Sequence, residues 1–324
     1  MRVLAGDIGG TNARLAIADL AGGAPRILKE QRYPSADSPG LAPIVRRFLD
    51  STGERPERAC FGIAGPVVNG ECRTPNLPWT VSAGDLARDI GIPCTALIND
   101  FVAAAHGVGA LGPADLVTIQ EGEPAEHGAI ALIGAGTGLG EGFLVWDGTR
   151  YRVHASEGGH TDFAASDAPT WRLRQALLDE YGRVSWERVL SGAGLAQVYR
   201  HLASTAFAPE RRDVQDEMRS GDPAAVVTKH ALAGDDPLSA KALEIFVAAL
   251  GAQAGNLALT VLATGGVYLA GGIAPRIVAK LRGDTFPAAF RSKGRMTELM
   301  KRIPVHVIVS PDVGLLGAAL AAAE

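Results

Sequence analysis

Hydrophobic positions in the first fifty residues change their spacing partway along the chain. Apolar and β-branched residues fill segments 2–8, 13–19 and 26–33, and glycine pairs separate them, a pattern typical of three strands joined by turns. In segment 41–51 the apolar positions instead recur every three or four residues, which predicts an amphipathic helix. The N-terminal half therefore begins with three strands followed by a helix.

The remainder of this half alternates strands with helices. The apolar run at 59–66 predicts a strand, and Ser82 begins an N-cap pattern for a helix that extends to about Ile90. The run "CTALIND", residues 94–100, is apolar until its last two positions, which favours a buried strand that ends on polar side chains. A further helix is expected from Phe101.

The second half repeats this order of elements. Strands are expected at 129–133, 140–146, 150–155, 266–270 and 303–310, with helices at about 239–263, from Pro275 and at 314–323. The intervening region, 156–238, is expected to be mainly inserted helices. Because Gly136-Thr137 occupies the place in this half that Gly10-Thr11 occupies in the first, the chain is interpreted as a duplicated unit. Two α/β lobes facing each other across a ligand cleft are the expected architecture.

Charge and composition narrow the classes of partner. The chain has 324 residues, 47% of them hydrophobic and 20% charged, so it can bury a substantial core. Its 31 basic and 35 acidic residues give a formal net charge of -4. Nucleic acids and anionic membranes attract basic surfaces, so neither is an expected partner. A small ligand is expected instead.

Neither the N-terminus nor the cysteines indicate export. The start "MRVLAGDIGG" lacks the long apolar core of a signal peptide. Cys60, Cys72 and Cys94 are too few and too widely spaced for a disulfide framework or a zinc site, so a reduced cytoplasm is expected. The uncharged run between Glu244 and Arg276 contains polar residues and glycine pairs, and it is interpreted as a buried helix followed by a buried strand.

Two glycine-rich turns carry the first candidate chemistry. The turns "DIGGTN" and "GAGTGLG" (134–140) offer unobstructed backbone amides and one threonine hydroxyl each, which suits phosphate oxygens. Neither has the spacing of the commoner nucleotide-binding loops. Either one alone could simply be a tight hairpin turn. Their matching places in a repeat favour the phosphate-binding interpretation.

A third glycine cluster lies in "GGVYLAGGIAPR". Its Gly271-Gly272 pair ends an expected strand, where an adenine or ribose could lie against bare backbone, although helix–strand packing would also explain the pair. Together the three clusters predict a triphosphate at the bottom of the cleft and a nucleoside on the second lobe.

Motifs along the whole chain resemble those of a known family. The segments "GDIGGTNARLA", "LINDFVA", "GAGTGLGEG", "EGGHTDF", "WERVLSGAGL" and "LAGGIAPR" occur in the order found in the bacterial glucokinases of the hexokinase-like, actin-like ATPase superfamily. The chain is therefore identified as resembling that family. The cysteine-rich zinc motif of the broader repressor, open reading frame and kinase group is missing, so the resemblance is to the ATP-dependent glucokinases.

This resemblance implies a two-lobed actin-like ATPase fold, with duplicated ribonuclease H-like lobes. Each lobe is expected to contain a mixed five-stranded sheet flanked by helices, and the ligand cleft is expected between the lobes. The small lobe is expected to comprise residues 1–110 and 302–324, and the large lobe residues 111–301. Relatives commonly dimerise, so a homodimer is expected.

The implied activity is ATP-dependent phosphorylation of glucose to glucose 6-phosphate. Phosphoryl transfer to a sugar hydroxyl requires a proton acceptor and an aligned, dry pocket. Asp100 ends the strand "CTALIND" at its carboxyl edge, and the resemblance makes it the catalytic base. Capping of the helix from Phe101 is the structural alternative for this aspartate.

The resemblance also implies a set of sugar-binding residues. They are Asn76, Asn99, Asp100, Glu157, His160 and Glu187. Carboxylates and amides hold sugar hydroxyls well because they form several hydrogen bonds at once. Three alternatives remain open: Asn76 initiates a turn, Glu187 only pairs with Arg183 or Arg188, or Glu157 and His160 bind a metal. The Gly158-Gly159 pair disfavours a helical metal site.

The nucleotide site is expected to use residues from all three glycine clusters. They are Asp7, Gly9, Gly10, Thr11, Asn12, Gly136, Thr137, Gly138, Gly271 and Gly272. Asp7 is expected to hold Mg²⁺ of Mg-ATP through water, because Mg²⁺ retains much of its hydration shell. Two other functions remain as alternatives: a kinase of another hexose, and an actin-like ATP-binding protein that is not a kinase.

Overall fold

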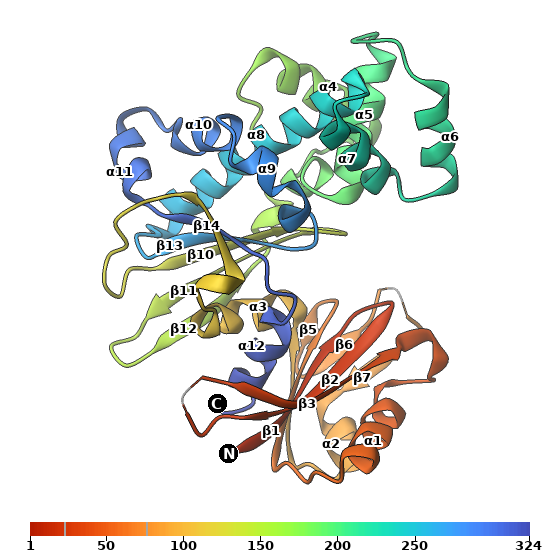
Figure 1. Cartoon of the computed structure of the whole chain (residues 1–324), viewed down its shortest axis with the longest axis vertical. Coiled ribbons are helices and arrows are strands. Elements are labelled where there is room, and N and C mark those ends of the chain that lie inside the picture. Colours follow the sequence, from red (N-terminus) through yellow and green to blue (C-terminus); the bar gives the residue numbers. More distant parts are fainter. Residues whose placement is uncertain (23, 76) are drawn as a thin grey trace. The chain divides into compact units, whose positions relative to one another are not determined.

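The computed structural model describes all residues of the chain except Gly23 and Asn76. It contains two compact units. Unit 1 comprises Met1–Asp115 and Ser310–Glu324, and unit 2 comprises Leu116–Val309. Each unit is built around one main β-sheet with helices packed on it (Figure 1).

The unit 1 sheet has five strands in the order β3-β2-β1-β4-β8. The strands are β1 (Arg2–Ile8), β2 (Asn12–Asp19), β3 (Arg26–Pro34), β4 (Arg58–Ile63) and β8 (Cys94–Asn99). Its α-helices are α1 (Leu41–Thr52), α2 (Ala83–Ile90), α3 (Asp100–Gly107) and α12 (Val313–Ala321), with 3-10 turns at Ser35–Asp37, Val108–Ala110 and Pro113–Asp115. A small second sheet contains β5 (Val67–Val68), β6 (Glu71–Arg73) and β7 (Thr80–Ser82). The hairpin β1–β2 is antiparallel, whereas β4 and β8 continue in parallel.

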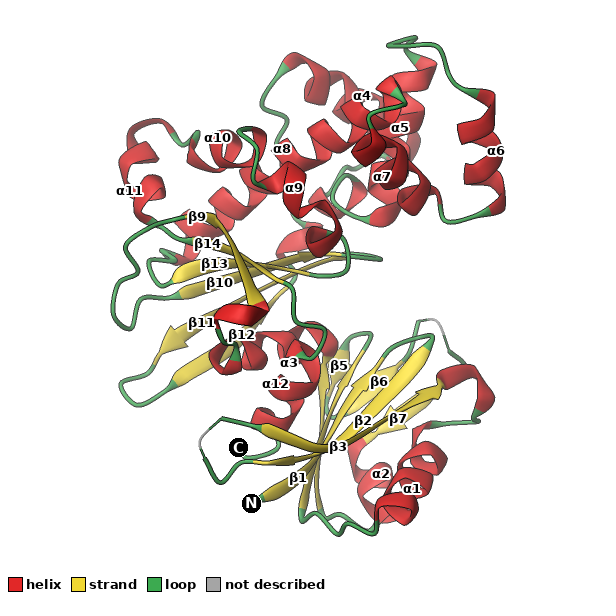
Figure 2. Cartoon of the chain, viewed as in Figure 1, coloured by secondary structure: helices red, strands yellow, loops and turns green. Residues whose placement is uncertain are grey.

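The alternation of side chains along β1 separates the two faces of this sheet. Leu4 packs in the core that α1 and α2 cover, and Val3 and Ala5 pack in the core that α12 covers. Figure 2 shows α1 and α2 on one side of the strands and α12 on the other. Small residues predominate in the α12 core, so this helix can approach the strands closely.

Helices α3 and α12 cross at backbone contact distance within unit 1. A Cβ atom added to Gly317 would lie 1.7 Å from the carbonyl oxygen of Ala103, and one added to Gly107 would lie 2.1 Å from that of Val313. Neither site has room for a methyl group. These glycines therefore allow the two helices to touch.

The unit 2 sheet has six strands in the order β12-β11-β10-β13-β14-β9. The strands are β9 (Leu116–Gln120), β10 (Ile130–Ala135), β11 (Leu139–Trp146), β12 (Tyr151–Ser156), β13 (Gly266–Ala270) and β14 (Val305–Ile308). The expectation of five strands is wrong here because β9 pairs antiparallel with β14 as a sixth. The strand is only five residues long and four of them are half-buried, so its pattern does not alternate between buried and exposed positions.

Helices cover the sheet of unit 2 and fill its insertion. They are α4 (Ala168–Tyr181), α5 (Gly192–Ser204), α6 (Arg212–Ser220), α7 (Pro223–Ala233), α8 (Pro237–Val261), α9 (Val278–Leu281), α10 (Thr285–Arg291) and α11 (Thr297–Arg302). Short 3-10 helices occur at Gly158–His160, Trp186–Arg188, Ala274–Ile277 and Gly294–Met296. Helices α4 to α7 lie in the region 156–238, where inserted helices were expected.

Helix α8 is the buried helix expected from the uncharged run, and β13 is the strand that follows it. The length and composition of this helix would allow it to cross a membrane. However, 72% of its most apolar 18-residue stretch is buried inside the protein. Core helices of soluble proteins pass the same test, so the burial accounts for its apolar character.

The division between the units differs from the expected lobe boundaries of 110 and 302. It falls after Asp115 and before Ser310. The second boundary moves because β14 pairs with β13 on one side and with β9 on the other, so this strand belongs to the unit 2 sheet.

Candidate active site

In unit 1, the turn between β1 and β2 presents free backbone donors. The N–H of Gly9 donates to the carbonyl oxygen of Asn12 at 2.9 Å. Buried Ser35 holds the turn's carbonyls: its N–H donates to the oxygen of Thr11 at 2.9 Å and its Oγ to that of Gly9 at 2.8 Å. In the described part of the chain, no group accepts a hydrogen bond from the N–H of Gly10 or Thr11. These two donors are available to a phosphate group.

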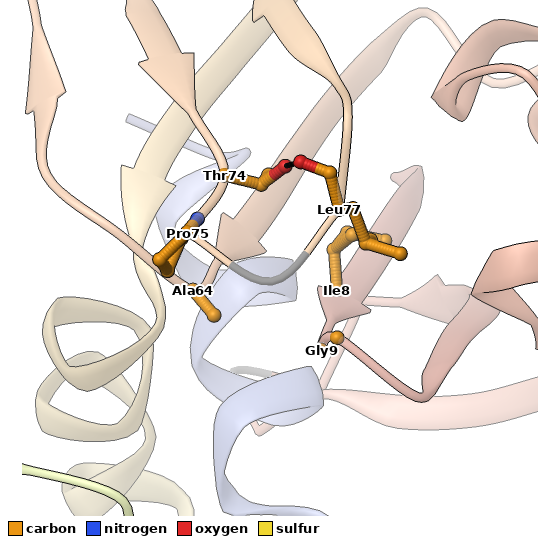
Figure 3. Close-up of a pocket in the computed structure, with 7 residues that line it drawn as sticks. Ile8, Gly9, Ala64, Thr74, Pro75 and Leu77 are labelled. Carbon is orange, nitrogen blue, oxygen red and sulfur yellow. Dashed lines mark hydrogen bonds between the residues drawn. The ribbon is translucent and has the colours of Figure 1, made fainter.

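A small pocket adjoins this turn (Figure 3). Its lining residues are Ile8, Gly9, Gly10, Ala64, Thr74, Pro75 and Leu77. The hydroxyl of Thr74 donates to the carbonyl oxygens of Leu77 and Trp79 at 2.9 and 3.1 Å, so it rigidifies the pocket wall. The predicted sugar residue Asn76 lies outside the described residues. The pocket has room for about one water molecule, about 10 Å³, so it is a side recess and not a substrate pocket.

Asp7 lies near the end of β1, beside the start of α12. A Cβ atom added to Gly314 would lie 3.6 Å from the carboxyl carbon of Asp7. Burial raises the pKa of Asp7, while the positive charges of Arg14 and Arg32 act in the opposite direction. The N-terminal end of a helix favours negative charge, so α12 supports the ionised carboxylate.

Arg14 on β2 ties the first hairpin to the loop before α12. Its guanidinium donates to Glu30 at 2.8 and 3.0 Å, to the carbonyl oxygen of Pro311 at 2.6 Å, and to Asp312. The side chain is largely buried. This residue therefore fixes the two chain segments that flank Asp7.

Asn99 and Asp100 lie where β8 ends and α3 begins. The Oδ1 of Asn99 accepts from the N–H of Phe101 at 2.9 Å, and its Nδ2 donates to the carbonyl oxygen of Gly65 at 2.9 Å. Asn99 is therefore the N-cap of α3. The carboxylate of Asp100 shares the same Phe101 N–H at 2.9 Å, so the helix does not depend on it for capping.

The Asp100 side chain remains accessible to solvent. Desolvation by surrounding protein atoms nevertheless raises the pKa of Asp100, and the negative charge of Asp7 raises it further. A carboxyl with a raised pKa is a stronger base when ionised than an ordinary aspartate. Asp100 thus combines accessibility with increased proton affinity.

In unit 2, the turn between β10 and β11 repeats the features of the first turn. Gly136 donates to the oxygen of Gly138 at 2.8 Å and accepts from the N–H of Gly192 at 2.9 Å. The N–H groups of Thr137 and Gly138 have no acceptor among the residues that the structure describes. A Cβ atom on Gly138 would lie 2.5 Å from an oxygen of Glu187, so a side chain there would displace the Glu187 carboxylate.

The Gly271-Gly272 turn follows β13, the parallel neighbour of β10. Gly271 has φ +80°, and a Cβ atom there would lie 2.4 Å from the carbonyl oxygen of Ala135. A Cβ atom on Gly136 would lie 4.0 Å from the nitrogen of Gly272. The second and third glycine clusters of the sequence therefore meet within unit 2.

Three predicted sugar residues gather in unit 2. His160 lies 3.9 Å from Glu157 through Nε2 and 3.9 Å from Glu187 through Nδ1. Glu187 also accepts from the N–H of Leu139 at 2.9 Å, which links this cluster to the second glycine turn. The loop Glu157–His160 forms a single 3-10 turn on β11, so it is not the α-helix that an i,i+3 metal pair would require.

The alternative partners of Glu187 are engaged elsewhere. Arg183 pairs with Asp162 at 2.8 Å and donates to the oxygen of His160 at 2.8 Å. Arg188 stacks over the ring of Tyr181 at 3.9 Å. In the described ranges, no three acidic, histidine or cysteine side chains form a metal cluster. A solvated ion pair therefore does not explain the place of Glu187.

The Glucokinase family model matches residues 4–324. The chain belongs to the glucokinase family. A curated glucokinase from Nostoc sp. is 43% identical over 99% of both chains. The crystal structure of a glucokinase from an Antarctic psychrotroph is 33% identical, with a TM-score of 0.88, and the match covers 99% of this chain and 98% of that one.

A more distant structure shares the fold. A ROK family glucokinase from Streptomyces griseus, solved in complex with glucose and AMPPNP, is 22% identical with a TM-score of 0.66, covering 100% of this chain and 99% of that one. The glucokinase resemblance and the actin-like α/β fold predicted from the sequence are confirmed.

Several supporting residues of this glucokinase family member were not predicted from the sequence. Ser35 carries no motif, and its contact with the first turn joins positions 26 apart in the chain. Glu141 did give a signal, a charged residue inside the apolar strand "LGEGFLVW", and the structure shows it to be buried. Arg14 lies inside the motif "GDIGGTNARLA", but its partner Asp312 is 298 positions away in the chain.

Proposed function

We propose that Asp100 is the proton acceptor in the glucokinase reaction of this chain. The activity, ATP-dependent phosphorylation of glucose, follows from membership of the family and from 43% identity over nearly the whole chain. The observation that supports Asp100 is its accessible carboxyl at the end of β8, with a pKa raised by desolvation and by Asp7. Asp100 accepts the proton of the 6-hydroxyl while the oxygen–phosphorus bond forms.

The free amides of the glycine turns support the assignment of the phosphate site. Gly10 and Thr11 of unit 1, and Thr137 and Gly138 of unit 2, each present N–H groups next to a threonine hydroxyl. Gly9, Asn12 and Gly136 shape these turns through their own backbone bonds. Such rows of donors bind phosphate oxygens. The Gly271-Gly272 turn is the proposed contact for the nucleoside.

The surroundings of Asp7 fit a magnesium ion that arrives with ATP. Mg²⁺ is commonly held by one or two carboxylates together with water and substrate phosphates. Asp7 supplies one carboxylate beside the first phosphate turn, and the described residues offer no larger cluster for a dedicated metal cage. Asp7 would therefore hold the ion through water, and the ion would neutralise phosphate charge.

The proposed sugar-binding residues have distinct roles. Glu157, His160 and Glu187 are close enough to hold neighbouring hydroxyls of one hexose. The side-chain oxygen of Asn99 already accepts a hydrogen bond from the α3 N-terminus, and one hydrogen of its Nδ2 is donated to Gly65. A sugar hydroxyl would therefore accept from the other hydrogen of Nδ2. Asn76 remains part of the proposal through the family resemblance.

The protein is further proposed to be a cytoplasmic homodimer. The three cysteines are free, two of them buried, which suits a reducing cytoplasm. The homodimer is proposed from the family resemblance.

An assay of ADP release with and without sugars tests the substrate assignment. We expect the highest kcat/KM with glucose, lower values with mannose, fructose and an N-acetylated amino sugar, and little release without sugar. Each lost or misplaced hydroxyl leaves a polar group of the site unpaired, which favours strong discrimination. A higher kcat/KM with another hexose would transfer the assignment to that sugar, and release that ignores sugar would contradict a sugar kinase.

Replacing Ser35 with Ala tests the phosphate turn. The change removes the bond to the oxygen of Gly9 but keeps the bond from the backbone N–H to Thr11. We expect KM for ATP to rise about three- to tenfold, the effect of one hydrogen bond, with KM for glucose nearly unchanged. Steady-state kinetics with each substrate varied measures both. Ser38→Ala is the control, because that hydroxyl bonds to Gly40 outside the turn; an unchanged KM for ATP in Ser35→Ala would count against the assignment.

A further inference from the structure

Four side chains of unit 2 form a continuous hydrogen-bonded chain. Lys293 Nζ donates to Asn256 Oδ1 at 2.8 Å, and Asn256 Nδ2 donates to Gln253 Oε1 at 3.1 Å. Gln253 Nε2 then donates to Glu141 Oε1 at 2.8 Å. We call these four residues the polar chain. It connects the segment after α10, one turn of α8, and β11.

The direction of every bond in the polar chain follows from its first member. An ammonium group can only donate, so Asn256 must accept with its oxygen and donate with its amide nitrogen. The same logic orients Gln253, whose amide nitrogen must find an acceptor in Glu141. A basic and an acidic side chain thus lie at the two ends, and aligned bonds of this kind strengthen one another.

The acidic end of the polar chain lies beneath the loop Glu157–His160. A Cβ atom on Gly158 would lie 2.0 Å from Oε2 of Glu141, and one on Gly159 would lie 2.1 Å from the carbonyl oxygen of Leu139. The loop therefore rests directly on the Glu141 carboxylate and on the backbone of β11. A shift of Glu141 would move the loop.

Packing alone does not require this arrangement. Glu141 is 4% exposed and Gln253 is 5% exposed, and burial raises the pKa of Glu141. A buried polar pair can often be replaced by apolar side chains of similar volume with little loss of stability. What an apolar pair would not reproduce is the fixed position of a carboxylate held from one side by a directed hydrogen bond.

We propose that the polar chain positions the sugar-binding loop, with Glu141 as the positioning residue for Glu157 and His160. The inference rests on the proposed function, which assigns that loop to glucose. The second phosphate turn is held by Glu187 at Leu139 and by the bond from Gly192 to Gly136, and neither bond involves a residue of the polar chain. Disturbing the polar chain should therefore raise the KM for glucose more than the KM for ATP.

Gln253→Leu and the double variant Glu141→Leu/Gln253→Leu test this inference. Gln253→Leu leaves a buried carboxylate without its donor, so Tm should fall and KM for glucose should rise about tenfold, with KM for ATP within about twofold. The double variant removes the unpaired charge, so Tm should recover while KM for glucose stays high. It also keeps the test usable if the single variant fails to fold.

A buried glutamine elsewhere in unit 2 provides the matched control. Gln120 donates to the carbonyl oxygens of Met300 and Ile303 at 2.8 and 2.6 Å. Gln120→Leu should lower Tm without changing KM for glucose. The difference between the two glutamine variants separates positioning from general destabilisation.

Four outcomes would overturn the inference. The polar chain is merely structural if the double variant recovers KM for glucose together with Tm, or if Gln253→Leu raises both KM values equally. Glu157→Gln, measured in parallel, separates this inference from the proposed function. If Glu157→Gln raises KM for glucose and Gln253→Leu does not, only the positioning role is wrong. If Glu157→Gln changes nothing, the loop is not the sugar site and both proposals are wrong.

Discussion

Asp100→Asn is expected to lower kcat by about 10²–10⁴, the usual contribution of a general base. An amide of the same shape cannot accept the proton of the sugar hydroxyl. Because Asn99 caps α3, the variant should fold and bind both substrates nearly as well as the wild type. Steady-state kinetics and circular dichroism measure the two effects. A turnover close to that of the wild type in a folded variant would exclude Asp100 as the base.

The pH dependence of kcat offers an independent measurement of the same group. The pKa of Asp100 is raised, so the base becomes protonated, and turnover falls, at a higher pH than for an ordinary aspartate. This acidic limb should disappear from the residual activity of Asp100→Asn. The pKa of Asp7 is also raised, so Asp7→Asn shows whether that residue contributes. Asp85→Asn, an exposed carboxyl on α2, should leave the profile unchanged.

Gly317→Ala is expected to destabilise unit 1 by about 3 kcal/mol, at the upper end of typical overpacking costs. The added methyl group would lie 1.7 Å from the carbonyl oxygen of Ala103, and neither backbone can yield unless α3 and α12 separate. Because α3 begins at Asp100, kcat should fall as well. Thermal unfolding followed by circular dichroism measures the loss, with the two units allowed separate transitions.

Gly109→Ala is the matched control for this helix crossing. Gly109 lies in the 3-10 turn after α3, and a Cβ atom there meets no other atom within 4 Å. Its Tm should stay within about 2 °C of the wild type, since changes at open sites seldom exceed 0.5 kcal/mol. Equal Tm values for the two variants would show that the helices accommodate a methyl group at their crossing.

Elements with a strong period were predictable from the sequence. Strand β8 and the start of α3 were predicted from an apolar run that ends on two polar residues, and the structure places Asn99 and Asp100 at that junction. The same reasoning located α8 and β13, because burial on all sides leaves a long uncharged run. The local sequence pattern is sufficient to predict an element when its own run of residues shows which positions are buried.

Features that depend on distant partners were not predictable. The edge strand β9 has only partial burial, and its pairing with β14 joins residues at opposite ends of unit 2. The contact between Glu141 and Gln253 spans 112 positions, and no spacing rule connects them. The candidate site shows the same limit: residue types could be predicted from motifs, whereas the bonds that orient them required the fold.

Helix α12 completes unit 1 although the whole of unit 2 separates it from α3 in the chain. During synthesis at about 5–20 residues per second, the ribosome would need roughly ten to forty seconds to produce that intervening stretch. Until then, the face of β1 carrying Val3 and Ala5 has no helix to cover it. The nascent chain is therefore expected to hold an incomplete domain through most of translation, when chaperone binding would matter most.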